Sequence, residues 1–140
     1  MIGTDLNLAD KILRKGNLVA IPTETVYGLA ANALNENAVL KIFETKQRPH
    51  FDPLIVHASK KHINDYGFDI PEKAQILTDK FWPGPLTILI SKPDSIPDIV
   101  TSGLSSIGLR MPKHPLTESL LKKLDFPLAA PSANLYGRIS

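Results

Sequence analysis

Two segments decide how this chain folds: Pro22-Thr23-Glu24-Thr25-Val26-Tyr27-Gly28 and Lys46-Gln47-Arg48-Pro49, with a segment of helical periodicity between them. Pro49 biases Arg48 toward an extended backbone through a steric clash. With Gln47 also extended, Lys46 and Arg48 project to the same side, because side chains alternate along an extended chain. Neighbouring cations repel each other unless an anion lies between them, and phosphate suits both side chains. The pair therefore predicts an anion site beside the hydroxyls of the first segment.

Length and composition predict one ordinary globular domain. The chain has 140 residues, of which 43% are hydrophobic and 21% charged. A net charge of +2 is too balanced to indicate nucleic acid or membrane binding. The sequence has no cysteine, which excludes a disulfide framework and a thiolate nucleophile. It also lacks an apolar run of membrane length and the features of a signal peptide, so we expect a cytoplasmic protein.

Helical and strand-like patterns alternate along the chain. Asn35 is the candidate N-cap of the second helix, and Asp69 with Glu72 predicts a capping box for the third. The apolar face of that third helix is predicted to contain Ile70, Ala74, Leu77 and Phe81. The predicted helices span residues 5–15, 36–46, 70–82 and 115–124, and the predicted strands span residues 18–21, 53–57, 86–90, 106–111 and 127–130.

This alternation predicts an α/β layered fold. The chain has twelve prolines, many of them at strand ends, which argues against a regular doubly wound sheet. We therefore expect a twisted, mixed, open sheet with flanking helices, built as a single domain over residues 1–140.

Several familiar sites are absent from the sequence. It contains no glycine-rich phosphate loop, no dinucleotide fingerprint and no nucleophile elbow, and its four histidines lack the spacing of metal ligands. What remains is a set of polar residues where predicted strands and helices end. In α/β sheets ligands bind where strand ends meet loops. We expect one crevice to be lined by Thr23, Thr25, Tyr27, Lys46, Arg48, His57, Arg110, Ser132 and Asn134.

Six segments resemble the YrdC/Sua5 family of threonylcarbamoyl-AMP synthases. They occur in the family's order, and six collinear matches are far more specific than any one of them. The segments are residues 22–28, 46–49, 53–57, 82–87, 108–112 with 114–115, and 131–134.

The resemblance implies a YrdC-like twisted open α/β sheet with a basic concave cavity. It also implies that L-threonine, bicarbonate and ATP, with Mg²⁺, are converted to threonylcarbamoyl-AMP and pyrophosphate. That product is the donor for the t6A modification of tRNA. A contact with tRNA and proteins of t6A transfer are therefore implied as partners, without a membrane.

The residues fit that nucleotidyltransferase chemistry. A carbamate formed on threonine must attack the α-phosphorus and expel pyrophosphate, so the site needs charge neutralisation and alignment more than a nucleophile. We expect Lys46 and Arg48 to be the catalytic cations, and Thr23, Tyr27 and His57 to bind the substrate. The predicted ATP-binding residues, which include no metal ligand, are Lys46, Arg48, Arg110, Ser132, Asn134 and Ser140.

Plainer interpretations stand beside these roles. Thr23 and Thr25 are typical of a closed turn, Tyr27 of a residue packed in a wall, and His57 of a buried structural histidine. The chain as a whole could be an RNA-binding or translation-related module, or a carbamoyl-adenylate-forming domain like that of hydrogenase maturation proteins. Balanced charge and the lack of aromatics interleaved with basic residues count against the RNA module. Dependence on threonine separates the three.

The sequence stops at Ser140, inside a segment that continues in the family. We expect the absent C-terminal part to leave a sheet edge or an apolar face uncovered and one wall of the cavity missing. Catalysis should then suffer more than nucleotide binding, because alignment of three reactants is sensitive to small displacements.

Overall fold

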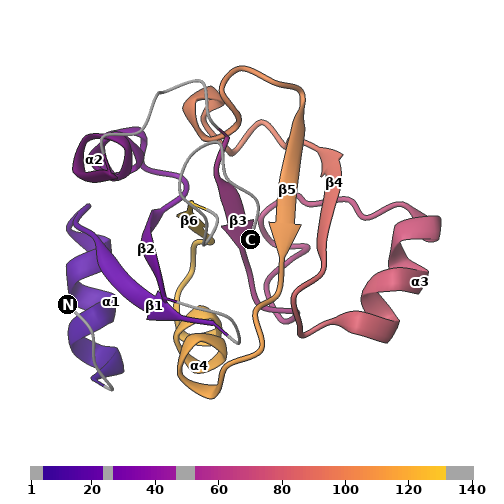
Figure 1. The fold of residues 1–140 in the computed structure, drawn as a ribbon, viewed down its shortest axis with the longest axis horizontal. Coiled ribbons are helices and arrows are strands. Elements are labelled where there is room, and N and C mark those ends of the chain that lie inside the picture. Colours follow the sequence, from indigo (N-terminus) through magenta and orange to yellow (C-terminus); the bar gives the residue numbers. More distant parts are fainter. Residues whose placement is uncertain (1–4, 24–26, 47–52, 132–140) are drawn as a thin grey trace.

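The computed structural model describes residues 5–23, 27–46 and 53–131, and over these ranges helices alternate with strands (Figure 1). None of the helices described is both long and apolar enough to cross a membrane. The helices are α1 (Leu6–Arg14), α2 (Glu36–Lys46), α3 (Glu72–Phe81), α4 (Pro115–Lys123) and the 3-10 helix η1 (Asp98–Thr101). The strands are β1 (Val19–Pro22), β2 (Tyr27–Asn32), β3 (Ile55–His57), β4 (Thr87–Ser91), β5 (Ser106–Arg110) and β6 (Leu128–Ala130).

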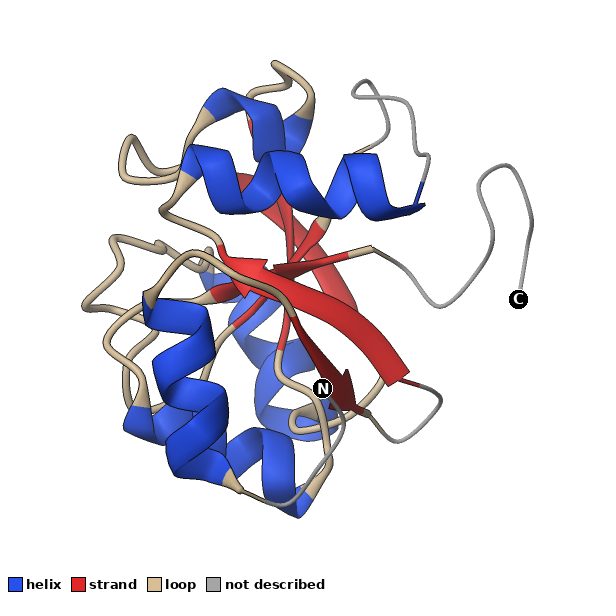
Figure 2. Ribbon diagram, turned by 90° about the vertical axis from the view of Figure 1, so that its left-hand side faces the viewer, coloured by secondary structure: helices blue, strands red, loops and turns tan. Residues whose placement is uncertain are grey.

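The strands described form one mixed sheet in the order β1-β2-β6-β3-β5-β4. Only the pair β3–β5 is parallel; the other neighbours run antiparallel. Figure 2 shows the strong twist of this sheet and helices on both sides of it. The expected α/β fold with a twisted, mixed, open sheet is therefore confirmed.

One face of the sheet carries the larger of two hydrophobic clusters. Residues of α2, of η1 and of the segment that follows β3 cover this face. We call this cluster the large core: Ala31, Ala33, Ala38, Val39, Ile42, Phe43, Leu54, Val56, Ala58, Ile63, Tyr66, Phe68, Ile88, Ile90, Ile96, Val100, Ile107, Leu109, Met111 and Ala129.

The opposite face is covered over β1, β2 and β6, where α1 and α4 pack on it. Both helices present an apolar stripe, with Leu13 in α1 and Leu120 and Leu121 in α4. We call the buried residues beneath them the small core: Ala9, Leu13, Val19, Ile21, Ala30, Leu120, Leu121, Leu124, Phe126, Leu128 and Ala130.

The other half of that face, over β3, β5 and β4, is exposed. The β4 side chains alternate between exposed and buried positions, and exposed Leu89 has 76% of its surface accessible. Leu89 pairs with Gly108, which pairs with Ile55, so these residues form one row across three strands. We call this half the open face: Ile55, Thr87, Leu89, Ser91, Ser106 and Gly108.

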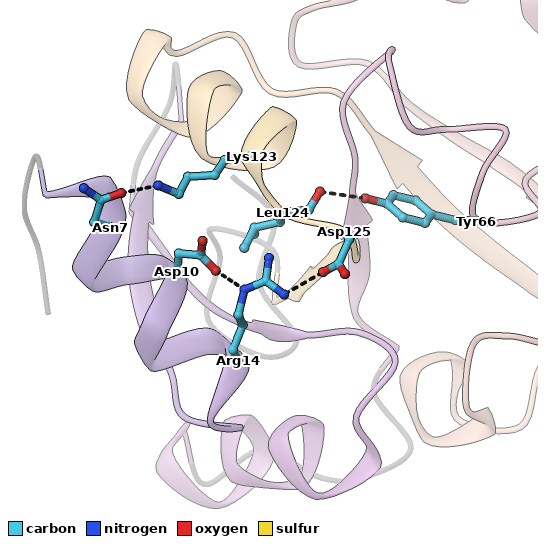
Figure 3. Close-up of polar contacts among 7 residues, drawn as sticks. All are labelled: Asn7, Asp10, Arg14, Tyr66, Lys123, Leu124 and Asp125. Carbon is cyan, nitrogen blue, oxygen red and sulfur yellow. Dashed lines mark hydrogen bonds and ion pairs between the residues drawn. The ribbon is translucent and has the colours of Figure 1, made fainter.

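Polar contacts fix α1 against α4 at the edge of the small core (Figure 3). Arg14 contacts Asp10 one turn earlier, and its Nη1 donates to Asp125 Oδ1 over 2.9 Å. Lys123 Nζ donates to Asn7 Oδ1 from the end of α4. Arg14 and Asp125 are solvent-exposed and Asp10 is half-buried, so the apolar stripes contribute more to the packing than the ion pairs do.

The predicted helix over residues 36–46 is confirmed at both ends. The side chain of Asn35 accepts a hydrogen bond from the backbone N–H of Ala38 over 3.1 Å, as an N-cap does. The other helices and the five predicted strands also occur, with ends that differ by at most two residues.

Strand β2 was missing from the sequence prediction. Its sequence, Tyr-Gly-Leu-Ala-Ala-Asn, contains glycine and two alanines, which have low strand propensity. Pairing with β1 on one side and β6 on the other makes it a strand, so long-range contacts override the local preference.

The predicted start of the third helix was wrong, and its predicted apolar face was right only in part, because Ile70 and Ala74 pack against the large core. Helix α3 begins at Glu72 without a side-chain cap, because Pro71 restricts Ile70 to an extended backbone. Leu77 and Phe81 are 45% and 49% exposed, and Thr78 is the buried residue of this helix. The packing face is therefore rotated toward Thr78 and leaves two large apolar side chains in solvent.

Truncation of a phenylalanine in the large core should destabilise the protein more than truncation of one on the exposed side of α3. Phe43 in α2 is 1% exposed, so Phe43→Ala should lower the free energy of unfolding by about 3–5 kcal/mol. Phe81→Ala is the matched control and should cost less than about 1 kcal/mol. Urea denaturation measures both. Equal losses would contradict the burial described here.

Stability should fall at alkaline pH because of Tyr66. Burial raises the pKa of Tyr66 to about 12, and the charges of Asp125 and Asp65 add to the effect. The neutral phenol is favoured in the folded state, so its contribution is complete below pH 10 and is lost as pH rises from about 10 to 12.

Tyr66→Phe should remove that contribution to the pH dependence. Between pH 9 and 12, the free energy of unfolding of the unmodified protein should therefore fall by up to about 2–3 kcal/mol relative to that of the variant. Parallel curves over this range would show that Tyr66 ionises as freely in the native state as in the unfolded state.

Candidate functional site

His57 and Arg110 lie side by side at the carboxyl ends of β3 and β5. These strands pair in parallel, and the register sets His57 opposite Arg110. The preceding residues, Val56 and Leu109, belong to the large core. Because side chains alternate along a strand, His57 and Arg110 project from the other face, on the side of the open face. The sheet thus brings together two of the predicted site residues.

His57 occupies the boundary between the covered and the open half of that face. It is 3% exposed, and it pairs in the sheet with Leu128 of the small core on one side and Arg110 on the other. His57 is therefore buried, as the structural interpretation predicts, and its role in binding the substrate stays a prediction.

Arg110 is fixed by the turn that follows α3. Its Nε donates to the carbonyl oxygen of Gly84 over 3.2 Å, and Gly84 N–H donates to Met111 over 2.9 Å. A Cβ at Gly84 would lie 2.5 Å from the carbonyl oxygen of Phe81, so this position requires glycine. Trp82 Nε1 closes the turn by donating to Leu86 over 2.7 Å. The turn at residues 82–86, part of a segment that resembles the family, therefore holds a cation in place.

Small residues form the floor beside these groups, and the sequence prediction did not include them. A Cβ at Gly108 would lie 3.3 Å from Thr87 Cγ2, and a Cβ at Gly28 would lie 3.6 Å from the Cβ of Ala130. Ala130 pairs with Ile55, so these positions join the open face to β6 and β2. Glycine inside a strand often marks close approach of a ligand or another backbone, and that signal was present in the sequence.

Thr23 and Tyr27 flank the tip of the β1–β2 hairpin. Tyr27 pairs with Pro22 at the end of the hairpin next to its loop, and Thr23 is half-buried. Tyr27 is 57% exposed among the residues described. Its two interpretations, as a residue of the cavity wall and as a substrate-binding residue, stay predictions.

Lys46 is the last residue of α2 and is exposed. Figure 2 shows that the end of α2 and the ends of β1 and β2 next to the hairpin loop extend to the same side of the molecule. That arrangement agrees with a site that draws on both segments.

Five of the predicted site residues lie outside the described residues: Thr25, Arg48, Ser132, Asn134 and Ser140. The basic concave cavity stays a prediction for the same reason, because the segments expected to close it include these residues. The residues of the predicted site that the structure describes are Thr23, Tyr27, Lys46, His57 and Arg110.

Comparison with known proteins places this geometry in a family. The Sua5/YciO/YrdC family model, described as "Telomere recombination", matches residues 11–140. This chain belongs to that family. It is 48% identical over 136 residues to a threonylcarbamoyl-AMP synthase from Pyrococcus abyssi and 50% identical over 134 residues to one from Bacillus subtilis. These alignments cover 96% and 94% of this chain, but 40% and 39% of the relatives.

A solved structure agrees with the sequence relatives. The crystal structure of P. abyssi Sua5 complexed with L-threonine is 46% identical, with a TM-score of 0.88. The alignment covers 100% of this chain and 42% of that one. The expected membership of the Sua5/YrdC family and the YrdC-like fold are therefore confirmed, while the chain spans about two fifths of the length of these proteins.

Proposed function

We propose that this chain carries a catalytic domain of a threonylcarbamoyl-AMP synthase. The reaction joins L-threonine, bicarbonate and ATP into threonylcarbamoyl-AMP and releases pyrophosphate and water. The observation that carries the proposal is 48% identity to the P. abyssi synthase over almost the whole chain. The fold match to a Sua5 complexed with L-threonine supports the choice of amino acid.

The chemistry has two parts, and neither needs a covalent enzyme intermediate. The threonine amine attacks the carbonate carbon and water leaves, which yields a carbamate. A carbamate oxygen then attacks the α-phosphorus of ATP, and the bond to the β-phosphate oxygen breaks. Negative charge accumulates at both steps, so fixed cations and alignment supply the catalysis.

Lys46 and Arg48 hold the phosphates in this proposal, and Arg110 supplies a further cation from the end of β5. The fixed position of Arg110 against Gly84 supports a binding role, because its guanidinium is already oriented. Thr23, Tyr27 and His57 contact the amino acid. The nucleotide is bound further by Ser132, Asn134 and Ser140.

The remaining assignments follow from the same activity. Mg²⁺ enters with the phosphates of ATP, which is the usual mode of its binding in such sites. We place the reaction in the cytoplasm, with tRNA as the final acceptor of the threonylcarbamoyl group and t6A-transfer proteins as partners.

Release of pyrophosphate from ATP and bicarbonate should depend on threonine. The kcat/KM for serine should be about 10–200-fold lower than that for threonine, because one methyl group in an apolar niche is worth about 1–3 kcal/mol. The assay compares threonine, serine and alanine under the same conditions. Equal stimulation by all three contradicts the proposed substrate, and stimulation by carbamoyl phosphate without threonine supports a carbamoyl-adenylate-forming domain instead.

Removing a cation from the proposed phosphate site should weaken ATP binding. Lys46→Ala and Arg48→Ala should each lose about 2–3 kcal/mol, because each removes a charged hydrogen-bond partner. That corresponds to a roughly hundredfold rise in Kd, measured by calorimetry. Lys73→Ala, an exposed lysine on α3, is the matched control and should leave Kd unchanged. Unchanged affinity in both site variants rules out the phosphate role.

A further inference from the structure

A cavity of about 450 Å³ lies beneath α3, on the side of the sheet opposite to His57 and Arg110. Its lining includes Met111 and Ile63 of the large core, whereas Arg110, one residue earlier, projects toward the open face. The lining residues are Lys60, Ile63, Ile70, Gln75, Thr78, Asp79, Trp82, Pro83 and Met111. We call this space the α3 cavity, and it is separate from the site proposed above.

The α3 cavity exists because α3 packs loosely on the rest of the fold. Figure 1 shows α3 beyond β4, at the margin of the sheet. Thr78 is its buried residue, while Gln75 and Asp79 are exposed and line the cavity mouth. The helix therefore forms one wall of a space large enough for a small ligand, since ligand sites span about 300–1,000 Å³.

The inner part of the α3 cavity suits an aromatic ring. Trp82 is half-buried, and its Nε1 donates to Leu86 over 2.7 Å, which fixes the orientation of the indole. Ile70, Trp82 and Met111 pack on or belong to the large core, so their positions are supported from behind. An aromatic side chain held in this way can stack with a nucleobase, and such contacts tolerate any base.

The outer edge offers a specific hydrogen-bonding pattern. Gln75 Nε2 donates to Asp79 Oδ1 over 3.2 Å across one turn of α3. The carboxylate retains further acceptor sites, and the amide retains one N–H donor. Guanine presents the complement along one edge: two adjacent N–H groups that a carboxylate accepts and a carbonyl oxygen that the amide N–H meets. Adenine lacks that arrangement.

A second, smaller cavity adjoins the α3 cavity and is lined by cationic and hydroxyl groups. This smaller cavity of about 180 Å³ shares Lys60, Pro83 and Met111 with it and is also lined by Ser59, Glu118 and Lys122. Ser59 is 4% exposed, and its buried hydroxyl makes no hydrogen bond within the part of the chain described, which is a costly state for a polar group. Lys60, Lys122 and the Ser59 hydroxyl can together bind one phosphate group. The negative charge of Glu118 disfavours a nucleotide with more phosphates.

We propose that the α3 cavity binds a guanine nucleotide with a single phosphate. The base stacks on Trp82 with its edge on Gln75 and Asp79, and the phosphate lies toward Lys60 and Ser59. A free guanosine monophosphate and a guanosine in single-stranded RNA present the same groups. Neither source depends on the synthase activity proposed above.

Trp82 is the only tryptophan in the chain and reports directly on this cavity. Titration with guanosine monophosphate should quench its fluorescence saturably, because the base stacks on the indole. Inosine monophosphate lacks one amino group and adenosine monophosphate lacks the complementary edge, so both should bind about tenfold or more weakly. Equal quenching by all three, or no saturable quenching by any, overturns the proposal.

Matched variants locate the site. Asp79→Asn and Lys60→Ala should each raise Kd about tenfold, whereas the exposed neighbours Asp69→Asn and Lys61→Ala should not. Lys46→Ala should leave the Trp82 signal unchanged, because Lys46 belongs to the other site. Affinity that falls equally in variants and controls overturns the assignment.

A short uridine-rich oligonucleotide with one central guanosine, and the same oligonucleotide with inosine, identify the source. If the guanosine oligonucleotide has a lower Kd than the free nucleotide, the source is RNA. The reverse order points to a free nucleotide. Equal affinity for the guanosine and inosine oligonucleotides, without preference among free nucleotides, shows that no guanine is recognised.

Discussion

The parallel pairing of β3 with β5 is the contact on which the rest of this molecule depends. It sets His57 opposite Arg110 and, one residue earlier, Val56 opposite Leu109. Side-chain alternation then sends the polar pair to one face and the apolar pair into the large core. A shift of one residue would exchange these two sets, so burial of Val56 and Leu109 fixes the position of the site.

Unequal covering of the sheet leaves room for the proposed site. Helices α1 and α4 bury β1, β2 and β6, while the open face over β3, β5 and β4 stays accessible among the residues described. Small residues such as Gly108 and Ala130 keep that floor flat where it meets the polar strand ends. The other side shows a related effect, because loose packing of α3 leaves a cavity around Trp82 and Met111. Both proposed sites therefore lie where helices do not pack.

Much of this architecture could be predicted from local pattern. Helix α2 was placed correctly at both ends, because Asn35 caps it and Val39, Ile42 and Phe43 share its buried face. Strand β2 could not be found in the same way, since Gly28 and its alanine neighbours acquire their structure from two partner strands. The apolar face of α3 was predicted from spacing alone, and spacing does not say which side of a helix meets the sheet.

The sequence by itself determined the α/β class, the family and the identity of the polar residues at strand ends, because these depend on residue order and local preference. The tertiary structure decided which of these residues meet. Register pairs His57 with Arg110, the turn at Gly84 orients the guanidinium, and the hairpin exposes Tyr27. Such relations join positions far apart in the chain, and only packing in three dimensions can fix them.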